Sequence, residues 1–338
     1  MTTPSALPTS RGLGRRDWSY ILRRARHGFV LHRGIDAAAG LTFFTTLAFF
    51  PTALSVVSAF ALADNDSSAT DDILAVVGEF VTTDTVDTLR NPLESLLTID
   101  YPWLAFAIGI VLTVWSVSSY ATAFGRAMNV VYEVGDGRRV ILFRLLMMAV
   151  SVVITLGFGA IVVILLTTPR AAAVLGKAMG IDEPWIVLWN IGKWPVLAII
   201  AFCLIALLYY ATPNVRHSRA RWVSWGALFA IVAWAIGTTG FAVYVLTVST
   251  YDRVYGWIGG GIVLLVWFYL TNIVLIFGAE VDAELVRARQ LAAGIEAEVR
   301  VQLPERSTVR TDRLAVIRER DEQRGKDIRE KSGRERPL

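Results

Sequence analysis

Six long stretches of this sequence contain almost no charged residues, and this feature constrains the fold more than any other. Five of them hold no Asp, Glu, Lys or Arg, and the remaining one holds only Lys193. The stretches are residues 37–62, 101–125, 145–169, 185–210, 222–251 and 254–279. Each exceeds the ~20 residues with which a helix crosses ~30 Å of hydrocarbon, and none has the polar face of a helix in a soluble domain. The sequence therefore predicts an all-α polytopic membrane protein with six transmembrane helices.

Composition agrees with this interpretation. Apolar residues make up 54% of the chain and charged residues 18%, against about 25% charged residues in a typical soluble domain. The first stretch is not a cleaved signal peptide, because bulky Phe49 and Phe50, rather than small residues, precede Pro51. The one cysteine, Cys203, lies inside an apolar stretch, which excludes a disulfide framework.

The distribution of arginine and lysine predicts the orientation, because cytoplasmic loops carry an excess of both. The segments expected on one side hold Arg11, Arg15, Arg16, Arg23, Arg24, Arg26 and Arg33; Arg126, Arg138, Arg139 and Arg144; Arg216, Arg219 and Arg221; and Arg287 and Arg289. The opposite loops hold only Arg90, Arg170, Lys177 and Arg253. We therefore expect both termini in the cytoplasm and a multi-pass location in a bacterial inner membrane.

The six spans and the external loop 63–100 belong to a transmembrane domain at 35–285. Three further segments lie outside this domain. Residues 1–14 are expected to be disordered. Residues 15–33 predict a basic amphipathic helix in the headgroup layer, with an apolar face of Trp18, Ile21, Leu22, Ala25 and Phe29. The acidic loop 63–100 predicts short helices on the outer face. The charged tail 286–338 is expected to be partly disordered.

Lys193 is the most unusual residue within the spans, because a charge there is costly and is a functional hypothesis by default. It lies close enough to the outer end for its stem to extend to the surface beside Trp185, Trp189 and Trp194. The alternative is that Lys193 and Asn190 face a cavity and hold an anionic headgroup. The sequence leaves both readings open.

Pro51 lies inside the first span and removes one backbone hydrogen bond, which predicts a kinked or broken helix. The hydroxyls of Thr42, Thr45, Thr46 and Thr52 either satisfy freed carbonyls, line a cavity or only pack. The candidate translocation site consists of Lys193, Asn190, Thr42, Thr45, Thr46 and Pro51.

Glu280 and Asp282 end the last span, where a helix C-terminus disfavours anions. We expect them to form a cytoplasmic clamp with arginines such as those of the loop after span four, with gating or proton coupling as the alternative. Those arginines are Arg216, Arg219 and Arg221.

The sequence offers no set of residues for catalysis, a cofactor or a metal. It lacks a phosphate-binding loop, a dinucleotide fingerprint and a serine nucleophile elbow. Its three histidines, at 27, 32 and 217, have no carboxylates at metal-ligand spacing. We therefore expect a protein that is not an enzyme and does not bind nucleic acid.

Several short motifs, in order across residues 37–285, resemble the YihY/BrkB family of bacterial inner-membrane proteins, once mislabelled as ribonuclease BN. They are Ala39-Gly40-Leu41-Thr42-Phe43-Phe44 with Phe50-Pro51; Trp115, Ser118, Gly125, Asn129 and Tyr132; Tyr209 with Pro213-Asn214; Gly226; Tyr244; Tyr255-Gly256; Trp267; and Gly278-Ala279-Glu280. The sequence departs from the family at Phe43-Phe44, where relatives often place a tyrosine, and at Asp282, which is usually Asn.

The resemblance implies a six-helix membrane fold, and it links the chain to envelope properties such as serum resistance and lipid handling. The sequence leaves three functions to be distinguished. The first is a transporter or flippase-like protein for a lipid or other amphipathic envelope component. The second is a scaffold that recruits partners through its external loop or tail. The third, a nuclease, has only the old family label and the arginine-rich loops behind it. The expected partners are membrane lipids, anionic ones above all, while a homo-oligomer and envelope protein partners remain open.

Overall fold

The computed structural model describes residues 15–63, 101–167, 183–216, 225–247 and 257–334. These residues form eight α-helices and contain no strand. The helices are α1 (Arg15–Leu31), α2 (Gly34–Ala63), α5 (Pro102–Val131), α6 (Val140–Leu166), α8 (Glu183–Ala211), α9 (Trp225–Thr247), α11 (Trp257–Ala292) and α12 (Val309–Arg334). Helices α2, α5, α6, α8, α9 and α11 are long and apolar enough to cross a membrane, which confirms the six spans. The external loop 63–100 lies, beyond Ala63, outside the described residues.

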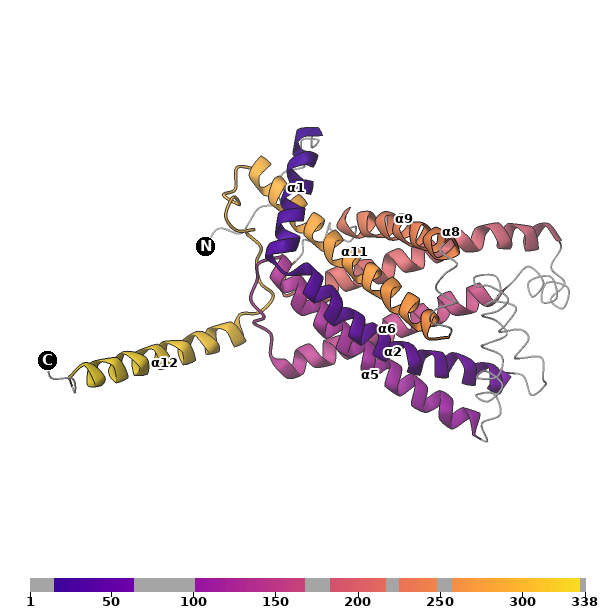
Figure 1. The fold of residues 1–338 in the computed structure, drawn as a ribbon, viewed down its shortest axis with the longest axis horizontal. Coiled ribbons are helices and arrows are strands. Elements are labelled where there is room, and N and C mark those ends of the chain that lie inside the picture. Colours follow the sequence, from indigo (N-terminus) through magenta and orange to yellow (C-terminus); the bar gives the residue numbers. More distant parts are fainter. Residues whose placement is uncertain (1–14, 64–100, 168–182, 217–224, 248–256, 335–338) are drawn as a thin grey trace.

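The helices pack most tightly at one end of the bundle, which we call the basal end. It is the end at which α1 and the segment after α11 lie (Figure 1). The main hydrophobic core lies here and joins the last turns of α5 and α8 to the first turns of α6 and α9. Phe124, Met128 and Met147 are fully buried in it. The opposite, distal halves of the spans contribute little to this core, so the bundle is closed at one end.

Helices α9 and α11 approach closely through glycines at this end. A Cβ added to Gly278 would lie 2.7 Å from both the Ala230 Cβ and the Tyr209 hydroxyl. A Cβ on Gly226 would meet Asp282 and the Gly278 carbonyl. Small residues of this kind allow membrane helices to pack backbone against backbone.

Gly278→Val is therefore expected to push α9 away from α11. Overpacking of this kind costs about 1–3 kcal/mol, so the midpoint of heat-induced unfolding in detergent should fall by several degrees. Gly260→Val on the same helix is the control, because a Cβ there meets nothing within 4 Å. Equal midpoints for the two variants would contradict the close approach.

Helix α1 packs on α11, which corrects the expectation that its whole apolar face contacts lipid. Ile21 and Ala25 are buried against Val281, Leu285 and Ala288, whereas Trp18 and Leu22 remain about 40% exposed. The sequence alone does not show which part of the apolar face of α1 is buried. The packing partner of α1 is the part of α11 that continues beyond the last apolar stretch.

The first part of the tail packs against the rest of the protein. Ala297 and Val301 are buried, and the Val215–Glu305 bridge pairs the tail with the residues after α8. Arg306 donates to the carbonyls of Val215 and Tyr210 near the end of α8. Beyond this, α12 is helical and its side chains from Asp312 to Lys331 are exposed, so the described part of the tail differs from the expected partial disorder.

Candidate functional site

A cavity of about 270 Å³ lies between the spans, on the distal side of the core. Its walls come from five helices. They consist of Thr45, Ala48, Phe49, Thr52, Ser55 and Val56 of α2; Ile110, Thr113 and Val117 of α5; Ile154, Thr155, Phe158 and Gly159 of α6; Leu204 of α8; and Phe268 of α11. These residues lie near the middle of α2, α5 and α6. The spans therefore leave unfilled space among them at the depth of the hydrocarbon core.

The cavity is lined mainly by carbon, with a few hydroxyls. Thr45 and Thr52 donate to the carbonyls of Leu41 and Ala48, at 2.9 and 2.7 Å, and Ser55 donates to the Pro51 carbonyl at 2.8 Å. The Thr155 hydroxyl is buried and has no partner among the described residues. Because most of these hydroxyls are satisfied within their own helix, the lining suits an apolar chain better than a hydrated ion.

A buried asparagine separates the cavity from the core. Asn272 of α11 is 1% exposed. Its Nδ2 donates to the Phe268 carbonyl at 2.9 Å and lies 3.3 Å from the hydroxyls of Thr42 and Thr45. The Tyr120 hydroxyl donates to its Oδ1 at 2.9 Å. This Asn272 cluster joins α2, α5 and α11 by hydrogen bonds that an apolar surrounding strengthens.

Sequence reasoning missed Asn272 and Tyr120, although a signal was present. A strong hydrogen-bonding amide within an otherwise apolar span is costly unless it is paired. The formal charge of Lys193 is the more conspicuous feature of the sequence, but it lies elsewhere in the fold. The predicted hydroxyls are divided between two places, with Thr42 in the cluster, Thr45 in both cluster and cavity, and Thr46 bonded to the Thr42 carbonyl.

Pro51 does not break α2, which is continuous from Gly34 to Ala63. The carbonyl that a proline at 51 frees is that of Leu47. The hydroxyls of Thr42, Thr45, Thr46 and Thr52 donate elsewhere, each to the carbonyl four residues before it. The suggestion that these hydroxyls satisfy the freed carbonyl is therefore wrong.

Lys193 does not line this cavity. Its side chain is buried, its Nζ donates to the Thr167 carbonyl at 3.2 Å, and the same Nζ lies 5.7 Å from the Trp194 ring centroid. Thr167 is the C-cap of α6, where a cation is favourable. The ammonium thus ties α8 to the end of α6, and the nearby Asn190 Oδ1 has no partner in the described part of the chain.

The two acidic residues at the basal end of α11 have separate partners. Glu280 accepts a 2.8 Å hydrogen bond from His32 Nδ1. Asp282 accepts one of 2.7 Å from the Tyr132 hydroxyl and one of 3.2 Å from the Gly226 N–H. Among the described residues, the partner of Glu280 is thus a histidine, whereas the prediction named arginines. The side chain of Arg216 is exposed, and Arg219 and Arg221 lie outside the described residues.

The pairing with Glu280 makes the contribution of His32 to stability depend on pH. The hydrogen bond to the Glu280 carboxylate raises the pKa of His32 above 6.5, against the opposing effect of burial. A raised pKa means that the stabilisation is complete below about pH 6.5 and is lost as the pH rises through the pKa in the folded protein.

His32→Gln should therefore lower the thermal midpoint most at pH 6 and progressively less toward pH 9. The measurement is the difference between the midpoints of wild type and variant at each pH. A difference that stays constant over this range would contradict the charged pair.

The family-motif residues in the described ranges mostly build the basal end. Asn129 accepts a 2.7 Å hydrogen bond from the Asn214 N–H. Asn214 Nδ2 donates to the carbonyls of Gly135 and Ser307, both at 2.8 Å, and Pro213 is buried beside it. Trp115 is exposed, with the Arg144 guanidinium 5.4 Å from its ring centroid. Tyr255 and Gly256 lie outside the described residues.

Comparison with known proteins gives a consistent result. The family described as virulence factor BrkB matches residues 25–301. A ribonuclease-like protein of Bacillus subtilis, YfkH, is 30% identical over 78% of this chain and 94% of its own length. A UPF0761 membrane protein of Aliivibrio salmonicida is 27% identical over 81% of this chain and 85% of its own length. No solved structure matches.

Proposed function

Because the chain belongs to the virulence factor BrkB family of membrane proteins, we propose that it moves a lipid or another amphipathic envelope component between the leaflets of a bacterial inner membrane. The observation that carries the proposal is the cavity among the spans. Its size and apolar lining suit part of an acyl chain. A scaffold that only recruits partners has no need for space at this depth.

The closed basal end supports the same proposal. Core residues and the Asn272 cluster fill the bundle below the cavity, and a lipid flippase needs a barrier of this kind against water and ions. We infer that the basal end faces the cytoplasm, because Arg24, Arg138, Arg300 and Arg306 lie there and cytoplasmic segments are rich in arginine. Both termini are then cytoplasmic.

Neither the similarity to YfkH, which is named as ribonuclease-like, nor the basic loops make this chain a nuclease. No group of three or more His, Cys, Asp or Glu side chains in the described part of the chain is placed to hold a metal ion. The arginines of the basic loops are explained by the excess of arginine in cytoplasmic segments. We therefore propose that the protein is not an enzyme.

The test is reconstitution into liposomes with a phospholipid that carries a fluorophore on a short acyl chain. We expect dithionite to quench inner-leaflet label at least tenfold faster with protein than in empty liposomes. Equal rates would reject lipid movement.

A variant lacking 309–338 separates transporter from scaffold. It removes the exposed α12 but keeps the structural residues 293–308, so lipid movement should remain within twofold of wild type. A scaffold that works through α12 would lose its partners when 309–338 is deleted. Such a scaffold would not move lipid in the liposome assay, with or without these residues.

A further inference from the structure

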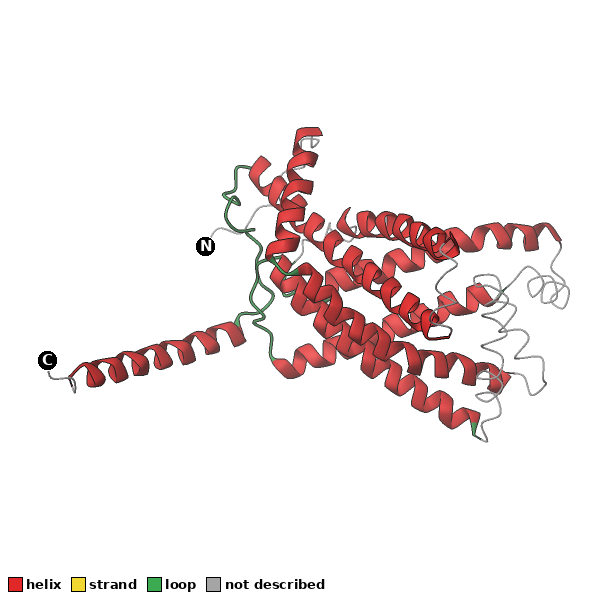
Figure 2. Ribbon diagram, viewed as in Figure 1, coloured by secondary structure: helices red, strands yellow, loops and turns green. Residues whose placement is uncertain are grey.

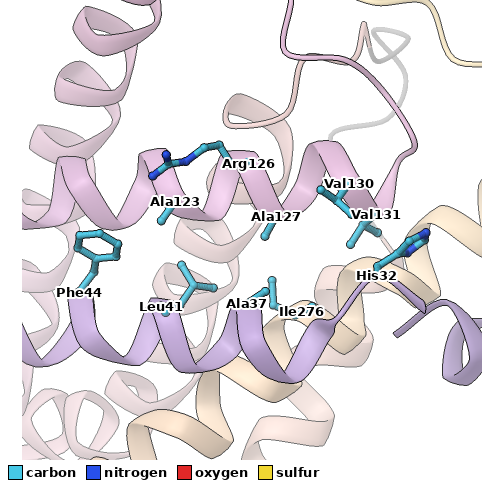
Figure 3. Close-up of a pocket in the computed structure, with 11 residues that line it drawn as sticks. His32, Ala37, Leu41, Phe44, Ala123, Arg126, Ala127, Val130, Val131 and Ile276 are labelled. Carbon is cyan, nitrogen blue, oxygen red and sulfur yellow. The ribbon is translucent and has the colours of Figure 1, made fainter. Parts of the chain in front are cut away.

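A second pocket, of about 280 Å³, lies at the basal end between α2 and α5. We call it the α2–α5 groove (Figure 3). Ala37, Gly40, Leu41 and Phe44 line it from α2, and Ala123, Arg126, Ala127, Val130 and Val131 from α5; His32 and Ile276 complete it. It shares no lining residue with the cavity of about 270 Å³ among the spans, which we call the central cavity.

The floor of the groove is apolar and has room for more atoms. Small side chains, such as Ala37 and Ala127, leave this space open on both helices. A Cβ added to Gly40 would meet nothing within 4 Å. Exposed apolar surface of this shape on a membrane helix is covered by hydrocarbon.

Arg126 is the exception in this apolar surrounding. It lies five residues before the end of α5, about 7.5 Å along the helix axis. Its side chain is exposed and extends back along α5 over Ala123, away from Val130 (Figure 3). It makes no hydrogen bond or ion pair with any described residue, and the His32 at the other end of the groove already binds Glu280.

A guanidinium in this position attracts an anion, and no described residue supplies one. A charge within a span is costly unless it is paired or reaches water, and the groove lining contains no carboxylate. Arginine binds phosphate oxygens through two parallel N–H groups. The bilayer supplies phosphate at this depth, already attached to the hydrocarbon that the floor of the groove suits.

We propose that the α2–α5 groove binds one anionic phospholipid, with the phosphate on Arg126 and an acyl chain that runs from there past Phe44 and Ala123 toward the middle of the membrane. The positive charge of Arg126 and the apolar lining together select a lipid rather than free phosphate or a peptide. The site does not depend on lipid movement and would exist in a scaffold as well.

The test is native mass spectrometry of the full chain, titrated with phosphatidylglycerol or phosphatidylcholine in detergent. Wild type should retain one phosphatidylglycerol with at least tenfold higher affinity than Arg126→Gln. Gly40→Leu, which fills the groove, should lose the same affinity without loss of charge. Arg139→Gln is the matched control, since it removes an exposed basal charge outside the groove and should bind within twofold of wild type.

Three outcomes would overturn the proposal. The first is that Arg126→Gln binds phosphatidylglycerol as wild type does. The second is an equal loss in Arg126→Gln and Arg139→Gln, which indicates general attraction to basic residues. The third is full displacement of the lipid by millimolar inorganic phosphate, which assigns the site to the free anion.

Discussion

Replacing Arg287 with leucine is expected to leave little folded protein in the membrane. Arg287 is 1% exposed. Its Nη2 lies 3.0 Å from Glu133 Oε1, its Nε 3.1 Å from Glu284 Oε2, and its Nη1 donates to the Ala297 carbonyl at 2.6 Å. One guanidinium thus connects α11 to the loop after α5 and to the tail.

The size of this effect follows from what the substitution leaves behind. Glu284 remains buried, and the cation left beside it among the described residues is the partly exposed Arg24, 3.0 Å away. Glu133 loses the partner it has in Arg287. Removing one member of a buried ion pair costs about 3–5 kcal/mol, against a total stability of about 5–15 kcal/mol for a typical protein. Fluorescence-detected gel filtration should show a monodisperse peak reduced severalfold.

Two further variants identify the cause. Arg318→Leu on the exposed α12 removes the same charge and should behave as wild type. Adding Glu284→Gln to Arg287→Leu should restore part of the peak, because one stranded carboxylate is neutralised. If Arg287→Leu matched Arg318→Leu, the basal end would not be held together by this residue.

The second large effect is expected on lipid movement. Gly159 lines the central cavity, and a Cβ added there meets nothing within 4 Å. Leucine at this position would place four carbon atoms in the space that an acyl chain needs. It should also favour the helix by up to about 1 kcal/mol, because glycine is a poor helix former.

Gly159→Leu is therefore expected to fold as well as wild type but to move lipid at least tenfold more slowly in the dithionite assay. Gly240→Leu is the matched control, since its Cβ also meets open space and it does not line the cavity. Wild-type rates in Gly159→Leu would show that lipid does not pass through this cavity.

The features of the fold that could be predicted are those that depend on residues close together in the sequence. The six spans could be found because freedom from charge over more than twenty residues is a local property with one physical explanation. The basal end could not, because its contacts join residues far apart in the sequence. Glu280 pairs with His32 and Arg306 caps α8, and no spacing rule connects these pairs.

The candidate site was predicted only in part, for a related reason. Thr45 could be proposed as a cavity residue because a hydroxyl in an apolar span stands out in the sequence. The cavity itself is a space among five helices, and a sequence does not show where side chains fail to meet. Lys193 was misleading, because its partner is the carbonyl of Thr167, and a backbone acceptor leaves no signature in residue types.

The most direct test of the account is photocrosslinking with a phospholipid that carries a diazirine in its acyl chain, followed by mapping of the modified residues on α6. If lipid enters the cavity, the diazirine should insert at Thr155 in wild type and not in Gly159→Leu, while insertion at the exposed Val153 and Leu156 stays the same in both. Insertion at Val153 and Leu156 alone, unchanged by the substitution, would show that lipid surrounds the bundle without entering it.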